Sequence, residues 1–396
     1  MNWQRQISIG NEMSYMMFLS SAFILVGILS QVFLLVFVGV FFLLFVFLNK
    51  YYLKHVGSKI IVSVDKSTIK LFKGEESDFS LMLRQEGMLP ILNGHIRIMI
   101  DDVIGFKNER KVLETEQIEL TLPLTLIGKQ ISSTSLPFEG KQRGVAKIRT
   151  LEIRIPHLFG FGEAYLQYTK PINFETIIYS SPETVGGIEK IVPKNQGEYP
   201  IRTSFFEDMT AIVGTRGYVP TDPFNRVHWK ASARTNQLQT KIFDKTAQFS
   251  WTIIINVREQ KLEQYLSGLT YLLESATVKN IPFEVFVNVR RAGKTPYIHI
   301  PLGKGKEHLA RALELIARLS KHSITIPFHY MIHTIGRQQQ LSPYLILLGE
   351  IEENEQLILR SFARKGVDCF KVIENEDAIY LQKASFSVKR GNSDAI

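Results

Sequence analysis

Cysteine is almost absent from this sequence of 396 residues. Cys369 is the one residue of its type, so the chain cannot form an internal disulfide. Structural disulfides belong to oxidising compartments, and a single cysteine agrees with a reducing one. Because Cys369 lies in an apolar stretch, we interpret it as a buried structural thiol rather than as a nucleophile.

Charged side chains are absent from residues 13–48, which are rich in leucine and phenylalanine. One straight helix over this run would be about 54 Å long, whereas the apolar core of a bilayer is about 30 Å thick. Two shorter spans fit better, with a turn near Ser30 and Gln31. A cleaved signal peptide would need a shorter apolar region and a small-residue cleavage site, and neither is present. We predict a transmembrane helical hairpin over residues 1–57; a single tilted span or a re-entrant loop is the alternative.

Cations flank this apolar run at both ends. Arg5 precedes it, Lys50, Lys54 and Lys59 follow it, and the connecting turn is uncharged. Because lysine and arginine are retained on the cytoplasmic side of a membrane, both ends of the hairpin are expected there. The sequence therefore predicts a two-span protein of the cell membrane whose soluble body faces the cytoplasm.

The chain has a net charge of +9 and a pI near 9.3. Such a balance favours anionic partners, and the nearest anionic surface is the membrane lipid of the cytoplasmic leaflet. Nucleic acid is the alternative, but the sequence has no motif that interleaves basic and aromatic residues. We expect membrane lipid as a partner and no nucleic acid.

Residues 58–181 have the pattern of a β-domain. Short runs of β-branched and apolar residues are separated by glycine, proline, asparagine and aspartate. Residues 147–155 largely alternate between polar and apolar side chains, which places one face inward and the other in water. The spacing predicts an antiparallel sandwich of Ig-like architecture, without the cysteine pair of a true immunoglobulin domain. The predicted strands are 59–64, 69–72, 78–83, 94–100, 117–126, 145–155 and 176–179.

Residues 250–396 change to alternating strands and helices, which is typical of a parallel α/β domain. The clearest helix is an amphipathic stretch in which Leu262, Leu266, Leu269 and Leu273 share one face. The intervening residues, 182–249, are predicted to be a linker and a special segment. The predicted strands of the α/β domain are 251–257, 283–289, 344–348 and 367–372, and its predicted helices are 262–276, 307–319 and 354–363.

The special segment, residues 214–234, combines aromatic and basic residues. Asp222 followed by Pro223 predicts the start of a helix, because an N-cap oxygen precedes proline at the first helical position. Continued helix would place Arg226, Lys230 and Arg234 on one face. Val227 and Ala231 would share a more buried face, with Trp229 as a core anchor. The simpler alternatives are a solvated charge row and an internal pair between an arginine and the aspartate.

This segment resembles the signature of the family called domain of unknown function 58. The family has glycine where this chain has Thr221, and its acidic tail is reduced here to Phe243-Asp244-Lys245. The segment Pro156-His157-Leu158-Phe159-Gly160 is similar to the family's turn before the signature. The matching signature residues are Arg216, Tyr218, Asp222, Arg226, Trp229, Ser232, Ala233 and Arg234.

The resemblance implies a role and partners that composition does not reveal. Members of that family often combine a transmembrane hairpin, a β-sandwich and a domain similar to von Willebrand factor A modules. They are commonly encoded beside MoxR-type AAA+ ATPases and transglutaminase-like membrane proteins. We therefore expect an adaptor for such an ATPase in the assembly or maturation of other proteins, including those of the cell envelope. The expected partner-binding residues are Arg216, Tyr218, Asp222, Arg226, Trp229, Lys230, Ser232 and Arg234.

The metal site of a von Willebrand A domain uses Asp-x-Ser-x-Ser after the first strand. The equivalent positions here are Asn256, Arg258 and Gln260, which supply no carboxylate and add a positive charge. We therefore predict an α/β domain without a metal site, whose strand edge would bind a protein or an anion. His329 and His333 have metal-ligand spacing for a helix, but the flanking Ile-Pro-Phe favours a strand or loop. No metal or cofactor is expected.

Motifs of catalysis are missing. The sequence has no Gly-x-Ser-x-Gly and no His-Glu-x-x-His, and Gly160-x-Gly162 lacks the third glycine of a dinucleotide loop. Residues 303–306 lack the spacing of a phosphate-binding loop, so ATP hydrolysis would belong to another protein. We expect a non-enzymatic protein with no catalytic residues. The alternative is a hydrolase or transferase that acts on envelope precursors through an unrecognised site.

Overall fold

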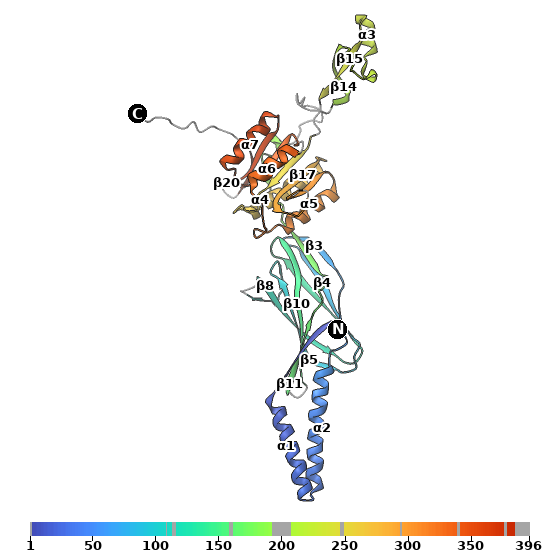
Figure 1. Ribbon diagram of the computed structural model, residues 1–396, viewed down its shortest axis with the longest axis vertical. Helices are drawn as coiled ribbons and strands as arrows, with labels where there is room; N and C mark the ends of the chain where they lie inside the picture. The colour runs from blue at the N-terminus through green and yellow to red at the C-terminus, as the bar shows by residue number, and fades with distance from the viewer. Residues whose placement is uncertain are drawn as a thin grey trace, which may run out of the picture. The chain divides into compact units, whose positions relative to one another are not determined.

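The computed structural model describes residues 2–107, 109–112, 116–157, 161–191, 207–245, 249–293, 295–338, 341–375 and 378–384. Its contacts divide the chain into two compact units, Met1–Tyr179 and Ser180–Ile396, which are described in turn. The first unit contains a helical hairpin and a β-domain, and the second contains an α/β domain and the signature segment (Figure 1).

Two apolar helices form the hairpin. Helices α1 (Asn11–Leu29) and α2 (Phe33–His55) are both long and apolar enough to cross a membrane. The chain reverses at Ser30 and Gln31, where Gln31 has a φ of 57°, so the predicted turn is confirmed. The helices approach closely where the Ser20 hydroxyl donates to the Gly39 carbonyl at 2.5 Å. A Cβ on Gly39 would lie 2.9 Å from the Ser20 carbonyl oxygen, so this contact requires glycine.

The β-domain consists of two sheets around one core. A single cluster of buried side chains includes Leu81 and Phe79 from one sheet and Ile98, Ile153 and Leu166 from the other, as a β-sandwich requires. One sheet contains β1 (Trp3–Ile9), β11 (Gly162–Tyr168), β10 (Gly144–Pro156), β5 (Ile91–Asp101), β8 (Gln117–Leu126), β7 (Glu109–Val112), β12 (Glu175–Tyr179) and β3 (Thr68–Phe72). The other contains β2 (Ile60–Val64), β4 (Glu76–Gln85), β9 (Ile131–Gly140) and β6 (Ile104–Gly105).

All the strands predicted between residues 58 and 181 are present, and several more were not predicted. The most informative addition is β1, which precedes the hairpin and pairs with β11. The chain therefore enters the hairpin from this sandwich and returns to it. Leu53 and Val56, near the end of α2, are fully buried in the sandwich core. The hairpin and the sandwich thus share one hydrophobic core.

The end of α2 is fastened by hydrogen bonds from the strand before the hairpin. The Arg5 guanidinium on β1 donates to the carbonyls of Leu53 and Val56, both at 2.6 Å. These carbonyls have no partner within a helix that ends here, and a cation at a helix C-terminus also complements the helix dipole. Gly57 then ends the helix with a φ of 69°, a left-handed conformation that favours glycine.

The α/β domain has a mixed sheet. Its strands lie in the order β13 (Val185–Gly186), β21 (Ala378–Lys383), β20 (Asp368–Asn375), β19 (Tyr344–Leu348), β16 (Trp251–Ile255), β17 (Phe283–Arg290) and β18 (Tyr297–Gly303). The four strands β20, β19, β16 and β17 are parallel, whereas β18 and β21 pair antiparallel with their neighbours. The parallel arrangement predicted from the sequence therefore holds for the middle of the sheet. Strand β13 lies within the stretch that the sequence assigned to a linker.

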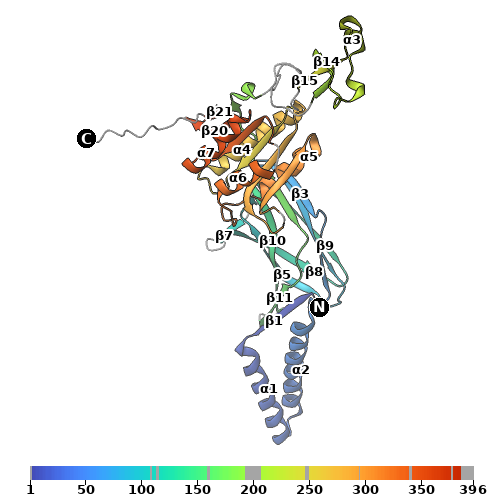
Figure 2. The same ribbon diagram turned by 45° about the horizontal axis from the view of Figure 1, so that its top comes forward.

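Helices cover both faces of this sheet. Ile253 and Ile255 of β16 pack with α4 (Leu262–Val278) and α5 (Lys306–Arg318), and Ile254 packs with α6 (Phe328–Gln338) and α7 (Glu353–Arg364). Figure 2 shows the helices around the sheet. Consecutive residues of β16 thus point into opposite layers, which explains why the strand is apolar apart from Thr252, whose hydroxyl donates to Glu284.

Helix α6 contradicts one prediction. His329 and His333 were expected in a strand or loop, but both lie on this helix and are exposed. Pro327 stands immediately before the helix, where it costs no hydrogen bond, and its carbonyl accepts from the Met331 amide. Buried side chains at helical spacing are the signal that was missed: Phe328, Met331, Ile332 and Ile335.

Candidate functional site

The segment that resembles the family signature forms a small structure that we call the signature module, residues 207–245. Strands β14 (Glu207–Gly217) and β15 (Gln239–Lys245) pair antiparallel. Between them lie a 3₁₀ turn, η2 (Phe224–Arg226), and the short helix α3 (Trp229–Thr235). Among the described side chains of the module, the buried apolar ones are Val227 and Phe243.

An ion pair joins the two ends of the first loop. The Arg216 guanidinium donates to both carboxylate oxygens of Asp222, at 2.8 and 2.5 Å. The same carboxylate accepts from the Val219 amide and from the Thr240 hydroxyl, each at 3.0 Å. The bonds from Arg216, followed by those from Val219 and Thr240, lower the pKa of Asp222 to about 2. Arg216 and Asp222 therefore fix the shape of the module.

The predicted helix start at Asp222 is wrong. Its side chain is engaged by Arg216 and β15, and α3 begins at Trp229 instead. The N-cap is His228, whose Nδ1 accepts from the Ala231 amide at 3.1 Å. Val227 has an extended conformation between η2 and α3, so no continuous helix joins them. Arg226 consequently does not share a helix face with the later cations.

Ser232 ties α3 to the strand that follows it. Its hydroxyl donates to the His228 carbonyl at 3.0 Å and accepts from the Gln239 amide at 2.8 Å. The side chain is buried.

Arg226 is half-buried, and its guanidinium lies 5.9 Å from the centre of the Phe243 ring. Both signature residues, Ser232 and Arg226, therefore make contacts within the module.

Trp229 was predicted to be a core anchor, and this prediction is also wrong. Its side chain is 61% exposed, and that of Phe224 is 65% exposed. The ring centres of Tyr218 and Phe224 are 6.1 Å apart, and those of Phe224 and Trp229 are 6.0 Å apart. Val227 occupies the buried position instead.

Two cations lie on the helix that carries Trp229. Lys230 and Arg234 are both exposed and are one helical turn apart on α3. We call Tyr218, Phe224, Trp229, Lys230 and Arg234 the aromatic–basic surface. The structure thus brings together only part of the predicted residue set. Phe224 belongs to this surface but was not among the predicted residues. Its position two residues before Arg226, the first of the predicted cations, is the sequence signal that could have identified it.

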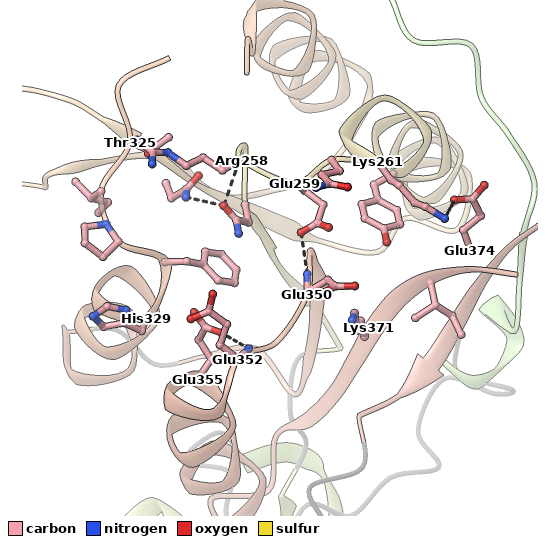
Figure 3. Close-up of a pocket in the computed structure, with 18 residues that line it drawn as sticks. Arg258, Glu259, Lys261, Thr325, His329, Glu350, Glu352, Glu355, Lys371 and Glu374 are labelled. Atoms are coloured by element: carbon pink, nitrogen blue, oxygen red, sulfur yellow. Dashed lines mark hydrogen bonds and ion pairs between the residues drawn. The ribbon is translucent and has the colours of Figure 1, made fainter. Parts of the chain in front are cut away.

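A second candidate is a crevice at the carboxyl ends of the parallel strands (Figure 3), with a cavity of about 850 Å³. Asn256, Arg258 and Gln260 line it, as expected from their positions after the first strand. The Asn256 carbonyl oxygen Oδ1 accepts from Asn288 Nδ2 at 2.9 Å and from the Arg258 amide at 3.3 Å. Its donors are within the protein, so this oxygen holds the loop together.

The crevice contains more acidic than basic side chains. Its lining cations are Arg258, Lys261 and Lys371, and its carboxylates are Glu259, Glu350, Glu352, Glu355 and Glu374. This composition disfavours the anion that the sequence predicted as one occupant. Burial raises the pKa of the Glu355 carboxyl, while Lys261 pairs with Glu374 at 2.7 Å. Across the described ranges, no three acidic, histidine or cysteine side chains are grouped to hold a metal ion.

The remaining motifs fall partly outside the described residues. Of the turn at residues 156–160, residues 158–160 are not described, whereas His157 is buried and lies beside Tyr52. The side chains of Asp244 and Lys245 are also outside the description.

Cys369 is buried in β20, and burial raises the pKa of its thiol to about 12. This agrees with the structural role predicted for it.

Comparison with known proteins gives no family for this chain. No family model matches the sequence, and no curated protein matches it. Solved structures that resemble it include the sixth cohesin of scaffoldin B from Acetivibrio cellulolyticus, with 11% identity, 31% of this chain and 99% of that chain covered, and a TM-score of 0.22. A CARDB domain from Pyrococcus furiosus has 9% identity, coverages of 30% and 92%, and a TM-score of 0.20. Scores this low carry no argument about function or partner.

Proposed function

We propose that this chain is a membrane-anchored, non-enzymatic adaptor of the domain-of-unknown-function-58 type that docks a MoxR-type AAA+ ATPase. The observation that carries the proposal is the aromatic–basic surface, on which Phe224 and Trp229 are exposed beside Lys230 and Arg234. Large exposed aromatic side chains are costly to leave in water, and tryptophan, tyrosine and arginine dominate binding energies at protein interfaces.

The charge of the module indicates an acidic partner. Among its described side chains the cations are Arg216, Arg226, Lys230, Arg234 and Lys241, and the one carboxylate is Asp222. Because Asp222 is neutralised by Arg216, the other four cations give the part of the module around α3 a positive field. An acidic rim around an apolar pocket on the ATPase would complement this surface in charge and in shape.

The order of the strands in the α/β domain supports a domain similar to von Willebrand factor A modules. Numbered from β16, the strands lie in the order 3-2-1-4-5-6, with β18 and β21 antiparallel. This is a doubly wound arrangement with its topological switch point between β16 and β19, where the acidic crevice opens. In the proposed adaptor this domain is metal-free, and its crevice is a secondary surface for protein.

The hairpin anchors the adaptor in the cell membrane with its body in the cytoplasm. Support comes from the two apolar helices and from the cations Arg5, Lys50, Lys54 and Lys59 at their outer ends. A cytoplasmic body is also the one that an ATP-dependent partner could reach. A transglutaminase-like membrane protein and a cell-envelope client remain further partners implied by the family resemblance.

Affinity capture tests this function. The full chain would be purified from gently solubilised native membranes with and without ATP, and bound proteins would be identified. We expect to recover an AAA+ ATPase in amounts that depend on ATP. The triple variant Trp229→Ala, Lys230→Glu and Arg234→Glu should no longer recover it. Lys306→Glu with Arg311→Glu, two exposed cations on α5, is the matched control and should not reduce recovery. Equal recovery with both variants would refute the docking surface.

A further inference from the structure

Two loops of the β-sandwich carry exposed apolar side chains beside the carboxyl end of α2. We call them the α2-side loops: the β4–β5 loop, residues 86–90, and the β8–β9 loop, residues 127–130. Met88 is 85% exposed and Ile127 is 66% exposed, and Ile131, the first residue of β9, is 62% exposed. Isolated apolar residues are ordinary on a protein surface, whereas several at one end of a domain mark a contact surface.

Hydrogen bonds from Gln85 place both loops at the same end of β4. The Gln85 amide donates to the Gln130 carbonyl at 2.9 Å, and its side-chain Nε2 donates to the Leu89 carbonyl at 2.5 Å. Gln85 is itself buried at the last position of β4. The apolar side chains of the two loops therefore belong to one end of the sandwich.

A further hydrogen bond sets the depth of this end relative to the hairpin. The apolar part of α2 is followed by the exposed side chains of Lys50 and Tyr51, and lysine and tyrosine occupy the interface between lipid and water at the end of a span. The Tyr52 hydroxyl donates to the Pro90 carbonyl at 2.7 Å. Met88 is only two residues from Pro90, which is about 7 Å of extended chain at most.

Two lysines lie in or next to the same loops. Lys129 is exposed in the β8–β9 loop, and the exposed Lys59 lies next to the β4–β5 loop, because its carbonyl accepts from the Glu86 amide at 3.0 Å. Glu86 is the acidic residue of the β4–β5 loop, and it pairs with Arg84 at 3.2 Å. Apolar side chains flanked by lysines are typical of protein surfaces that lie in the headgroup region of an anionic bilayer.

We propose that the α2-side loops rest on the bilayer, with Met88, Ile127 and Ile131 in the headgroup region and Lys59 and Lys129 on anionic headgroups. The inference rests on the proposed anchoring of α1 and α2 in a membrane. It adds a second attachment of the sandwich, in addition to the core it shares with α2. The bilayer itself then limits how the soluble domain tilts on its anchor.

Fluorescence quenching by brominated lipids tests the contact. Single cysteines would be introduced by Met88→Cys or Ile127→Cys in the full chain with Cys369→Ala, labelled with an environment-sensitive dye, and inserted into phosphatidylcholine–phosphatidylglycerol vesicles. Glu76→Cys is the aqueous control, because it is exposed at the start of β4, about 30 Å along the strand from Gln85. Phe41→Cys, in the middle of α2, reports insertion of the hairpin.

Each outcome decides between the proposals. The inference expects bromine near the headgroup end of the lipid to quench dye at positions 88 and 127 but not at 76. It also expects Lys59→Glu with Lys129→Glu to reduce quenching at position 88. If positions 88 and 127 are as unquenched as 76 while position 41 is quenched, the loop contact is overturned and the anchoring stands. If position 41 is also unquenched, the anchoring itself fails.

Discussion

Arg216 and Asp222 form a two-pronged ion pair across the first loop of the signature module, with nitrogen–oxygen distances of 2.8 and 2.5 Å. Asp222 also binds Val219 and Thr240, so one carboxylate connects β14, the loop and β15. The exposed rings of Phe224 and Trp229 follow directly along the chain. The signature thus contains two kinds of residue. Arg216 and Asp222 form contacts within the module, whereas Phe224 and Trp229 are exposed on its surface.

The first prediction concerns the titration of Asp222. Its pKa is lowered from 3.8 to about 2, chiefly by the bonds from Arg216. Since the folded pKa is the lower one, the stabilisation is complete above about pH 4 and is lost as the pH falls through about 2. Carboxyl ¹³C chemical shifts of labelled aspartate should give a midpoint near 2, and Arg216→Gln should raise it. Lys241→Gln, a nearby change outside this network, should not; a midpoint near 3.8 in the unmodified chain would contradict the account.

A second prediction concerns Arg5, which is half-buried and binds the Leu53 and Val56 carbonyls. Arg5→Gln should destabilise the junction of hairpin and sandwich by about 2 kcal/mol, because charged hydrogen bonds to two helix-end carbonyls are lost. Arg5→Lys should restore only part of the lost stability, since an ammonium group lacks the planar, two-pronged donor arrangement of the guanidinium. Urea-dependent hydrogen exchange of the β1 and β11 amides would measure the loss.

The control for Arg5 is another arginine of the same domain. Arg84 forms an exposed pair with Glu86, so Arg84→Gln should cost under about 1 kcal/mol. Equal effects of the Arg5 and Arg84 substitutions would show that the cap does not stabilise the junction.

The third prediction is that Cys369 is unreactive in the folded chain. Burial raises the pKa of its thiol to about 12. At pH 8 roughly one thiol in ten thousand would then be ionised, and the reagent would also have no access. Labelling with Ellman's reagent should be slow until urea unfolds the α/β domain, whereas the exposed cysteine of Glu76→Cys should react at once. Rapid labelling of Cys369 in the native chain would refute its structural role.

The fourth prediction concerns salt. The Debye length falls from about 10 Å to about 3 Å between 0.1 M and 1 M salt. Capture of the ATPase should therefore weaken over this range if Lys230 and Arg234 face an acidic surface. Lys230→Gln with Arg234→Gln should lower capture at 0.1 M and make it nearly independent of salt. A flat salt response in the unmodified chain would remove the electrostatic part of the proposal.

Much of the fold could be predicted from the sequence because its patterns are local. The alternation of residues 147–155, interrupted at Arg149 and Thr150, predicted β10, and the largely apolar run from Trp251 predicted β16. The helix over 262–276 was equally clear, since its buried residues recur at helical spacing. Strand β1 could not be found this way, because its burial is weak and its partner β11 lies more than 150 residues away.

The candidate site was harder to predict because its order comes from side-chain contacts across the module. Asp222 and Pro223 are a good local signal for a helix start, but Arg216 and Thr240 hold the aspartate elsewhere. Trp229 was expected inside because tryptophan is usually well buried, yet burial depends on which elements pack against α3, and the local sequence does not specify them. Sequence periodicity describes a helix face, and it does not say whether anything packs there.

The most direct test of the account is the affinity of the purified ATPase for the full chain in detergent or vesicles. Trp229→Ala should weaken binding by about tenfold or more, as expected for an aromatic anchor at the centre of an interface. Tyr330→Ala, which removes an exposed aromatic ring from α6, should leave the dissociation constant unchanged. If the two substitutions leave the same affinity as the unmodified chain, the signature module is not the docking surface.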